Sequence, residues 1–182
     1  MRPVVDRSQG EAPIDLESCD RHWPAQFAEE QARLQPALAP WLTGTIEHIG
    51  STAVPGLVAN PVIDPMAPVT SLEASRPAIK AVERLGYVYY PYQADRMHWF
   101  CKPSAAYRTH HLHLVPKDGA RWRERIAFRD ALRRDPALAS EYATLKYRLA
   151  AAHRFEREAY TEGKAPFIGR VLNSCGARSA DA

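Results

Sequence analysis

Three side chains that can carry acid–base or metal chemistry occur at informative spacings: Asp64, His111 and His113. The two histidines alternate with Leu112 and Leu114. Alternate residues of a strand share one face, so both imidazoles should point the same way while the leucines enter the core. A carboxylate beside two imidazoles can transfer protons or bind zinc, manganese or iron(II). We predict that Asp64, His111 and His113 are catalytic residues and ligands of one divalent metal ion; the alternative is that the histidines are hydrogen-bonding linkers.

A tight turn at Gly50-Ser51 lies between the apolar segment that contains Glu47 and His48 and the segment that ends at Asp64. Gly50 permits a backbone turn that a side chain would obstruct, and Ser51 adds a hydroxyl beside exposed N–H groups. This geometry suits an anion, although a hairpin turn followed by a capping aspartate would read the same way. We predict that Glu47, His48, Gly50 and Ser51 contact a ligand.

Cationic side chains occur on the two expected strands that follow. Arg96 and Lys102 share a face of a strand over 96–102, and Arg108 opens a strand over 108–115. Three such charges in one place repel one another unless an anion or a carboxylate neutralises them. Arginine is also the better bidentate partner for phosphate or carboxylate. We therefore predict that Arg96, Lys102 and Arg108 bind the anionic part of a ligand.

Two expected C-terminal helical segments contribute Lys146, Tyr160 and Lys164. Lys146 could point into a pocket, but it lies one position beyond an apolar stripe and could equally be solvated. Tyr160 and Lys164 are one helical turn apart and could close over an anion, with a surface position as the alternative. We include all three among the predicted ligand-binding residues.

The elements that must position these groups are expected strands and helices in alternation. Period-two patterns predict strands at 46–49, 87–90, 96–102 and 108–115, and a further strand that ends at residue 64. Period-3.6 patterns predict helices at 20–41, at 71–85, at 118–134 and from 136 onward. Pro65 and Pro68 predict that the Asp64 strand lies at a sheet edge or ends early, because proline cannot donate to a ladder. Asp20 is the expected cap of the first helix, which Pro36 should kink or interrupt.

The arginines near the end of the chain's central part and two tryptophans are expected to have structural roles. The arginines between 121 and 134 are expected on a solvated helix face. Arg129-Asp130 is expected to be a local structural ion pair; the alternative is that it orients a pocket group. Trp99 and Trp122 are expected in the core.

Five segments together resemble the GrpB family. They are Glu47-His-Ile-Gly-Ser-Thr-Ala-Val-Pro-Gly-Leu, Pro61-Val-Ile-Asp, Arg108-Thr-His-His-Leu-His-Leu-Val, Phe128-Arg-Asp-Ala-Leu-Arg and Tyr142-Ala-Thr-Leu-Lys-Tyr-Arg-Leu-Ala, with Tyr160, Lys164 and Phe167-Ile168 matching later. The resemblance covers about residues 20–172. The chain departs from the family pattern at Asn60, where lysine is usual, and at Pro65-Met66, which replace an apolar run.

The resemblance implies a nucleotidyltransferase-like α/β (α+β) fold, with a mixed sheet backed by helices and a C-terminal helical segment. A related domain is found fused behind dephospho-coenzyme A kinase in some bacteria. Fold kinship does not transfer substrate identity. The usual two-metal nucleotidyl transfer needs further carboxylates, and Met66 stands where one would share the face of Asp64. We therefore predict that this reaction is absent.

Length and composition bound the remaining expectations. A chain of 182 residues with 46% hydrophobic and 25% charged residues suits one globular domain, and a formal charge of +3 does not indicate general nucleic-acid binding. Cys19, Cys101 and Cys175 show no Cys-x-x-Cys spacing, which favours a reduced, cytoplasmic protein. We see no membrane-spanning run. The expected organisation is a flexible arm over 1–19, a domain over 20–172 and a flexible tail over 173–182.

The functional prediction is a protein that binds a small anion such as a nucleotide, a coenzyme A-like molecule or a carboxylate. Acid–base or single-metal catalysis at the same site would make it an enzyme. The alternative is a non-catalytic ligand-binding or chaperone-like partner module. The sequence predicts neither a membrane nor a specific nucleic acid as a partner, and it leaves the oligomeric state open.

Overall fold

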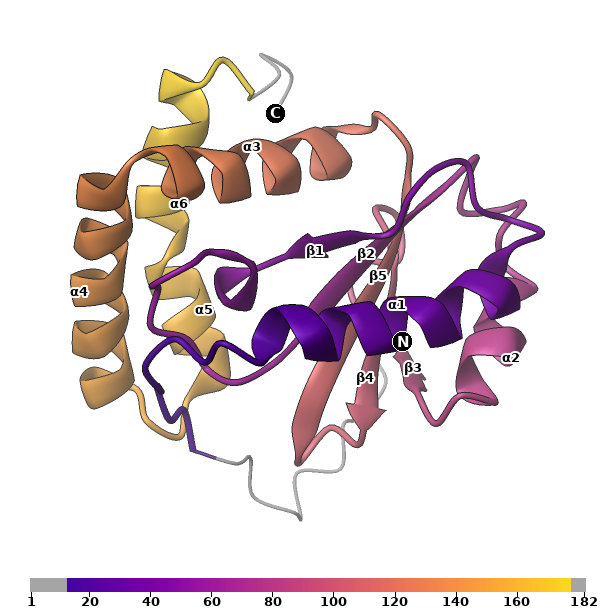
Figure 1. Cartoon of the computed structure of the whole chain (residues 1–182), viewed down its shortest axis with the longest axis horizontal. Helices are drawn as coiled ribbons and strands as arrows, with labels where there is room; N and C mark the ends of the chain where they lie inside the picture. Colours follow the sequence, from indigo (N-terminus) through magenta and orange to yellow (C-terminus); the bar gives the residue numbers. More distant parts are fainter. Residues whose placement is uncertain (1–12, 178–182) are drawn as a thin grey trace.

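The structure, a computed structural model, describes residues 13–177, and among these residues five strands form one mixed sheet (Figure 1). The strands are β1 (Glu47–Ile49), β2 (Asp64–Val69), β3 (Val88–Tyr90), β4 (His98–Pro103) and β5 (Arg108–Pro116), in the spatial order β1-β2-β5-β4-β3. Strands β2 and β5 run parallel, and the other neighbouring strands are antiparallel. The predicted fold class, a mixed sheet backed by helices, is confirmed.

Helices cover both faces of the sheet. Helices α1 (Trp23–Leu38) and α2 (Ala78–Glu83) pack on one face, and α3 (Ala120–Arg134) packs on the other. The C-terminal helices α4 (Pro136–Ala152), α5 (Arg157–Gly163) and α6 (Ala165–Ser174) gather beside the β1 end of the sheet, where Figure 1 shows them stacked next to α3. Apolar residues of α3, α4 and α6 form a separate core with the segment after β1.

The alternation along β5 decides which residues meet α1 and which meet α3. Leu112 and Leu114 are fully buried in the core under α1 and α2, as the period-two pattern predicts. His111 and His113 point to the opposite face, where Met66 and Val115 pack against α3. The α3 side of the sheet therefore holds Asp64 and the two histidines.

The expectation that the Asp64 strand lies at a sheet edge or ends early is wrong. Strand β2 begins at Asp64, continues to Val69, and pairs with β1 on one side and with β5 on the other. Its prolines fall where few ladder bonds are needed. Pro65 lies between an Ile63–His110 bridge and a continuous β5 ladder that begins at Met66, and Pro68 lies beyond the three-residue ladder with β1. A short neighbouring strand thus lets a proline-containing strand sit inside the sheet.

Local details of the helices also differ from the predictions. Asp20 does not cap α1; its carboxylate accepts hydrogen bonds from the backbone and ring of His22. Pro36 does not interrupt α1, which continues to Leu38. The predicted helix over 71–85 shrinks to α2, because Pro77 cannot sit inside a helix and becomes its N-cap.

Part of the expected N-terminal arm is ordered against the domain. Ile14 is buried, its N–H donates to the Arg154 carbonyl, and Glu17 forms a bridge with Ala59. Residues 1–12 of that arm and residues 178–182 of the expected tail lie outside the described residues. Within residues 13–177, no helix is long and apolar enough to cross a membrane.

Candidate functional site

One carboxylate oxygen of Asp64 faces both predicted histidines. The Nδ1 atom of His111 lies 3.3 Å from Asp64 Oδ1, and the Nε2 atom of His113 lies 3.4 Å from the same oxygen. The parallel pairing of β2 with β5 creates this juxtaposition, because it brings the first residue of β2 beside the middle of β5. The prediction that these three side chains meet is confirmed, whereas their catalytic role stays a prediction.

Burial and hydrogen bonding set the charge states of this set. Burial raises the pKa of Asp64, but hydrogen bonds from His111 and His113 outweigh this effect and hold the pKa below its usual range. Burial lowers the pKa of His113 to about 4, and the charges of Arg125 and Arg121 act in the same direction against the attraction of Asp64. Near neutral pH the site therefore contains an ionised Asp64 and a neutral His113.

Gly50 is required by the position of Asp64. Its backbone has a φ of +76°, and a Cβ added to it would lie 2.4 Å from Asp64 Oδ2. No side chain fits between the turn and the carboxylate. The turn continues as a short 3₁₀ helix over Ser51–Ala53, so Ser51 directly follows the glycine that lies against the carboxylate.

Lys146 reaches the turn from α4 and is not solvated. Its Nζ donates to Ser51 Oγ at 3.0 Å and also to the Val58 carbonyl, and only 2% of the residue is exposed. Burial, with a smaller effect of the Lys164 charge, lowers the pKa of Lys146 to about 7. The solvated alternative for this lysine is therefore wrong.

Tyr160 and Lys164, from α5 and the residue that follows it, contact each other near Asp64 and Lys146. The Lys164 Nζ lies 4.2 Å from the centre of the Tyr160 ring, which is buried. Burial, and then the charge of Arg125, lower the pKa of Lys164 to about 8, against the attraction of Asp64. The surface alternative is wrong for Tyr160, and Lys164 is close enough to Asp64 and Arg125 to interact electrostatically with both.

Sequence reasoning missed Arg121 and Arg125, which it placed on a solvated helix face. Burial, and then the charges of Arg125 and Arg96, lower the pKa of Arg121 to about 10, and Arg121 donates to the Gln93 side chain at 3.0 Å. Both arginines also influence His113. Their spacing of four residues, continued by Arg129, was the available signal, because it puts all three on one face of α3.

The predicted cationic set of Arg96, Lys102 and Arg108 does not converge on one place. Lys102 lies on the α1 face of the sheet, where its Nζ pairs with the buried Glu30 carboxylate at 3.0 Å. Arg96 is exposed in the segment before β4. Arg108 donates to the Ala105 carbonyl and lies over the Trp99 ring. The alternation of β4 carries Lys102 away from the histidines, so its assignment to the anion site was wrong.

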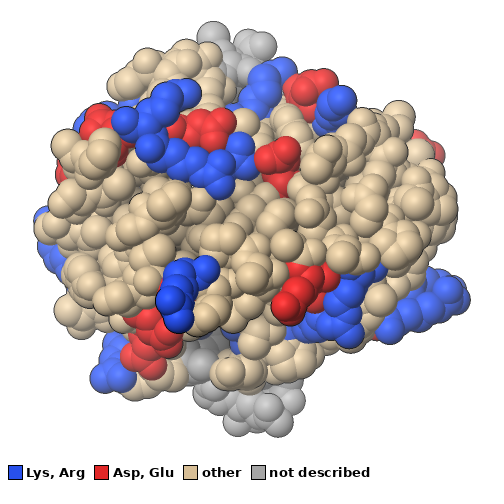
Figure 2. Space-filling model, in the orientation of Figure 1, with Lys and Arg blue, Asp and Glu red and all other residues tan. Residues whose placement is uncertain are grey.

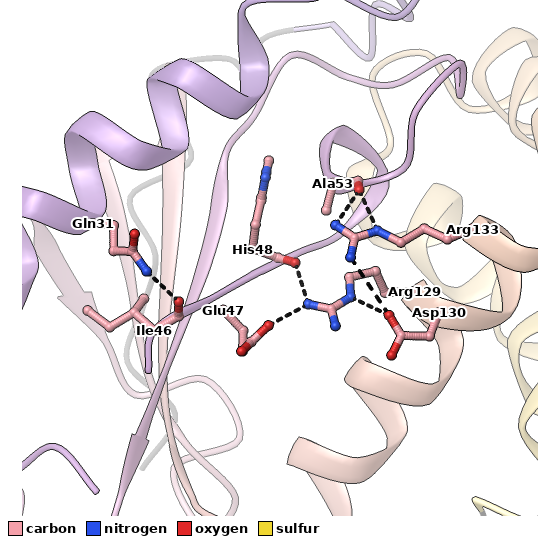
Figure 3. A network of polar contacts seen from close by, with 8 residues as sticks. All are labelled: Gln31, Ile46, Glu47, His48, Ala53, Arg129, Asp130 and Arg133. Atoms are coloured by element: carbon pink, nitrogen blue, oxygen red, sulfur yellow. Dashed lines mark hydrogen bonds and ion pairs between the residues drawn. The ribbon is translucent and has the colours of Figure 1, made fainter. Parts of the chain in front are cut away.

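Glu47 and His48 are held by other parts of the protein. Figure 3 shows Arg129 joining α3 to β1: its Nη1 lies 2.7 Å from Glu47 Oε2 and donates to the His48 carbonyl, while its Nε donates to Asp130. Arg133 donates to the Ala53 carbonyl in the same network. The Arg129-Asp130 ion pair is structural, as predicted, and it extends to the strand that precedes the Gly50 turn.

The His48 ring lies on the α1 side of β1. It stacks on Phe27 with ring centroids 4.5 Å apart, and its Nε2 lies 3.0 Å from Thr52 Oγ1. Burial lowers the pKa of His48 to about 4. His48 thus supports the turn from behind rather than pointing toward Asp64.

The residues present do not fit a two-metal centre of the nucleotidyltransferase kind. Met66 shares the face of Asp64 and is fully buried, and the Glu47 carboxylate is paired with Arg129. Among residues 13–177, no group of three or more His, Cys, Asp or Glu side chains could hold a metal ion. This result includes Asp64, His111 and His113, so the predicted site for one divalent ion at these three residues is not supported: the side chains meet, but they are not arranged as a set of metal ligands.

The exposed charges on the face that carries α1 are mixed. Figure 2 shows Lys and Arg side chains beside Asp and Glu side chains along the upper and the lower part of this face, with a wide uncharged area between them.

Comparisons with known proteins agree with the resemblance to the GrpB family that the sequence motifs indicate. The GrpB protein family matches residues 13–174. A UPF0157 protein from Pseudomonas aeruginosa is 37% identical over 164 residues, covering 87% of this chain but 66% of that relative. A UPF0157 protein from Deinococcus radiodurans is 37% identical over 160 residues, and the match covers 87% of this chain and 81% of that relative.

A solved structure gives the same fold. The crystal structure of conserved protein GrpB from Enterococcus faecalis superposes with a TM-score of 0.80 at 33% identity, covering 88% of this chain and 96% of that one. Sequence and structure thus agree over nearly all of the described domain, and the chain belongs to the GrpB family.

Proposed function

We propose that this protein binds a small anion bearing a phosphate or carboxylate group beside the Gly50-Ser51 turn and Asp64. The observation that carries the proposal is an excess of positive charge around one carboxylate. Lys146, Lys164, Arg121 and Arg125 influence one another or His113 electrostatically, and among residues 13–177 no ion pair joins any of them to an acidic side chain.

The protonation of this cluster supports an anionic partner. Burial, and to a smaller extent repulsion between neighbouring cations, lowers the pKa of Lys146 to about 7 and that of Lys164 to about 8. A bound anion would offset the repulsion and favour the protonated amines. Binding should therefore be coupled to proton uptake at pH 8 and should weaken as the pH rises.

Unpartnered polar atoms support the same site. Within the described part of the chain, the buried atoms His111 Nε2, His113 Nδ1 and Arg121 Nε have no hydrogen-bond partner. Buried polar atoms without partners are uncommon in folded proteins. Arg121 Nε–H could donate to an oxygen of an anionic ligand, whereas Nδ1 of neutral His113, whose Nε2–H donates to Asp64, would need a donor such as a ligand hydroxyl.

Chemistry on such a ligand is proposed to use Asp64 and the two histidines as proton carriers. Asp64 is ionised and His113 is neutral near pH 7, so the pair can accept a proton without first losing one. A non-catalytic binding module would use the same groups only as hydrogen-bond partners.

The test is a thermal-shift titration with inorganic phosphate, nucleotides, coenzyme A fragments and dicarboxylates at pH 6.5 and pH 9. A ligand selective for the folded state must raise its melting temperature. Arg125→Met and Lys164→Met should each weaken binding by about tenfold or more, roughly the loss of one charge-assisted contact. Lys80→Met removes an exposed lysine of α2 and is the matched control. Failure of every anion to shift the melting temperature, or equal affinity in Arg125→Met, would refute the proposal.

A further inference from the structure

We propose that Ser51 is a nucleophile and Lys146 its general base, so that the turn can accept an acyl group from an ester or thioester. A nucleophile and its base must lie within hydrogen-bond reach, and Lys146 Nζ donates to Ser51 Oγ at 3.0 Å. Serine–lysine pairs are one of the recurring forms of this arrangement. The proposal goes beyond anion binding because it assigns covalent chemistry to two residues.

The setting of Lys146 suits a base. Its side chain enters from α4, lies 5.0 Å from the centre of the Tyr142 ring and is almost completely buried. Tyr142 on the same helix is a ring contact of Lys146. The charged group that acts on Lys146 is Lys164, which follows α5. Low solvation and a neighbouring like charge lower the pKa of Lys146 to about 7, so a large fraction of the amine is neutral near pH 7.5.

The setting of Ser51 suits an accessible nucleophile on a rigid support. Ser51 is partly exposed, although the lysine behind it is buried. The turn is fixed from the other side, because the Thr52 hydroxyl donates to the Val62 carbonyl at 3.0 Å and lies the same distance from the buried His48 ring. A serine at the first residue of such a fixed turn keeps its hydroxyl toward Lys146.

The reaction divides into two balanced steps. The Ser51 Oγ–H proton passes to the neutral Lys146 amine while Oγ bonds to the acyl carbon, and the bond from that carbon to the alcohol or thiol breaks. The leaving oxygen or sulfur takes the proton from Lys146. Water then attacks the acyl-serine, giving its proton to Lys146, and Ser51 leaves with that proton as the free acid forms.

The substrate class follows from the neighbours of the pair. Lys164 acts electrostatically on Lys146, and Arg125 acts on Lys164. These charges would favour an acyl compound that carries a negative group and would stabilise the oxyanion that develops on attack. The expectation of a negative group rests on the proposed function, whereas the nucleophile assignment rests on the Ser51–Lys146 contact.

The experiment is labelling of the full chain with a fluorophosphonate probe, in which an activated serine displaces fluoride, followed by peptide mapping. Ser51 should be labelled at least tenfold faster than the exposed Ser140, and the rate should rise with pH around an apparent pKa near 7. Lys146→Arg keeps a charged donor that cannot act as a base, so labelling should drop by at least tenfold. Ser51→Ala should abolish it, and Ser140→Ala should not change the rate at Ser51.

A second measurement keeps the test independent of folding in the Lys146 variants. Lys164→Met removes the like charge that lowers the pKa of Lys146, so the labelling profile should move to higher pH. Labelling of Ser51 no faster than of Ser140, or a profile that does not change with pH, would overturn the assignment. Labelling without phosphate binding would support the nucleophile and contradict the proposed anion site, and phosphate binding without labelling would do the reverse.

Discussion

At the scale of single residues, the site depends on close approaches that allow little substitution. Asp64 accepts from two imidazoles on one oxygen, and its other oxygen lies against the Gly50 backbone. Lys146 is buried against a hydroxyl and a carbonyl without an ion pair among the described residues. A substitution at each of these positions should therefore change stability measurably, whereas the same substitution at a matched control position should change it less.

Gly50→Ala should destabilise the fold more than Gly56→Ala. Both glycines have a positive φ, at +76° and +77°, and Gly50 also has a ψ of −176°, which places it in a region that is essentially restricted to glycine. A Cβ at residue 50 would also meet Asp64 Oδ2, whereas a Cβ at residue 56 meets nothing within 4 Å. We expect an additional cost of about 1–3 kcal/mol for Gly50→Ala, as for other overpacked sites. Urea denaturation measures it, and equal midpoints for the two variants would contradict it.

Lys146→Met should change how stability depends on pH. The pKa of Lys146 is about 7 in the folded state and near its ordinary value in the unfolded chain. Between these values the unfolded state binds more protons, so the contribution of Lys146 to stability is present at high pH and is lost as the pH falls through about 7. Relative to the unsubstituted protein, Lys146→Met should therefore be more stable at pH 6 than at pH 9.5.

Urea denaturation at both pH values measures the Lys146 effect, with Lys80→Met as the control for an exposed lysine. A stability difference between Lys146→Met and the unsubstituted protein that is the same at both pH values would mean that the buried lysine keeps its ordinary pKa.

At the scale of elements, α3 connects the candidate site to the frame of the protein. Arg121 and Arg125 act on His113, while Arg129, one turn further along, is tied to β1. The same face of one helix thus supplies charges to the site and fixes the strand that leads into the Gly50 turn. Displacing α3 should disturb both.

Arg129→Met should destabilise the protein by about 2–4 kcal/mol, because it leaves the Glu47 carboxylate and the His48 carbonyl without their partner. Arg134→Met, which removes an exposed arginine from the same helix, should change stability by less than about 0.5 kcal/mol. The comparison uses denaturant midpoints at constant pH. Equal effects of the two substitutions would show that the Arg129 network does not hold β1 against α3.

At the scale of the whole molecule, the two sheet faces have different tasks. The α1 side contains the main apolar core together with the Glu30–Lys102 pair, and the α3 side contains Asp64, His111 and His113, with Arg121 and Arg125 on α3 itself. A family relationship and a shared fold therefore position the site but do not supply the carboxylates of a two-metal reaction.

Incubation with magnesium, labelled ATP, CTP, GTP or UTP and a broad pool of acceptors should release no pyrophosphate above the level without enzyme. The reason is that Asp64 has Met66, not a second carboxylate, on its strand face, and Glu47 is already paired with Arg129. Release that disappears in Asp64→Asn would contradict this prediction and would make Glu47 the next candidate for a metal ligand.

The fold class followed from the resemblance of several motifs to the GrpB family. The sequence by itself determined the strand alternation that separates His111 and His113 from Leu112 and Leu114, and the Gly50-Ser51 turn. These features are local or follow from a period of two or 3.6 residues, so the chain records them directly. Even the meeting of Asp64 with the histidines followed from the carboxylate at the end of one apolar segment and the imidazoles on another.

Only the tertiary structure decided which charges join that site. The sheet order put β2 in the interior, the alternation of β4 sent Lys102 to Glu30 on the far face, and the packing of α3 and α4 brought Arg125 and Lys146 in from segments that look solvated. The direction in which a polar side chain points depends on which face of its element is covered. That choice is made by packing between distant segments, and spacing along one segment does not contain it.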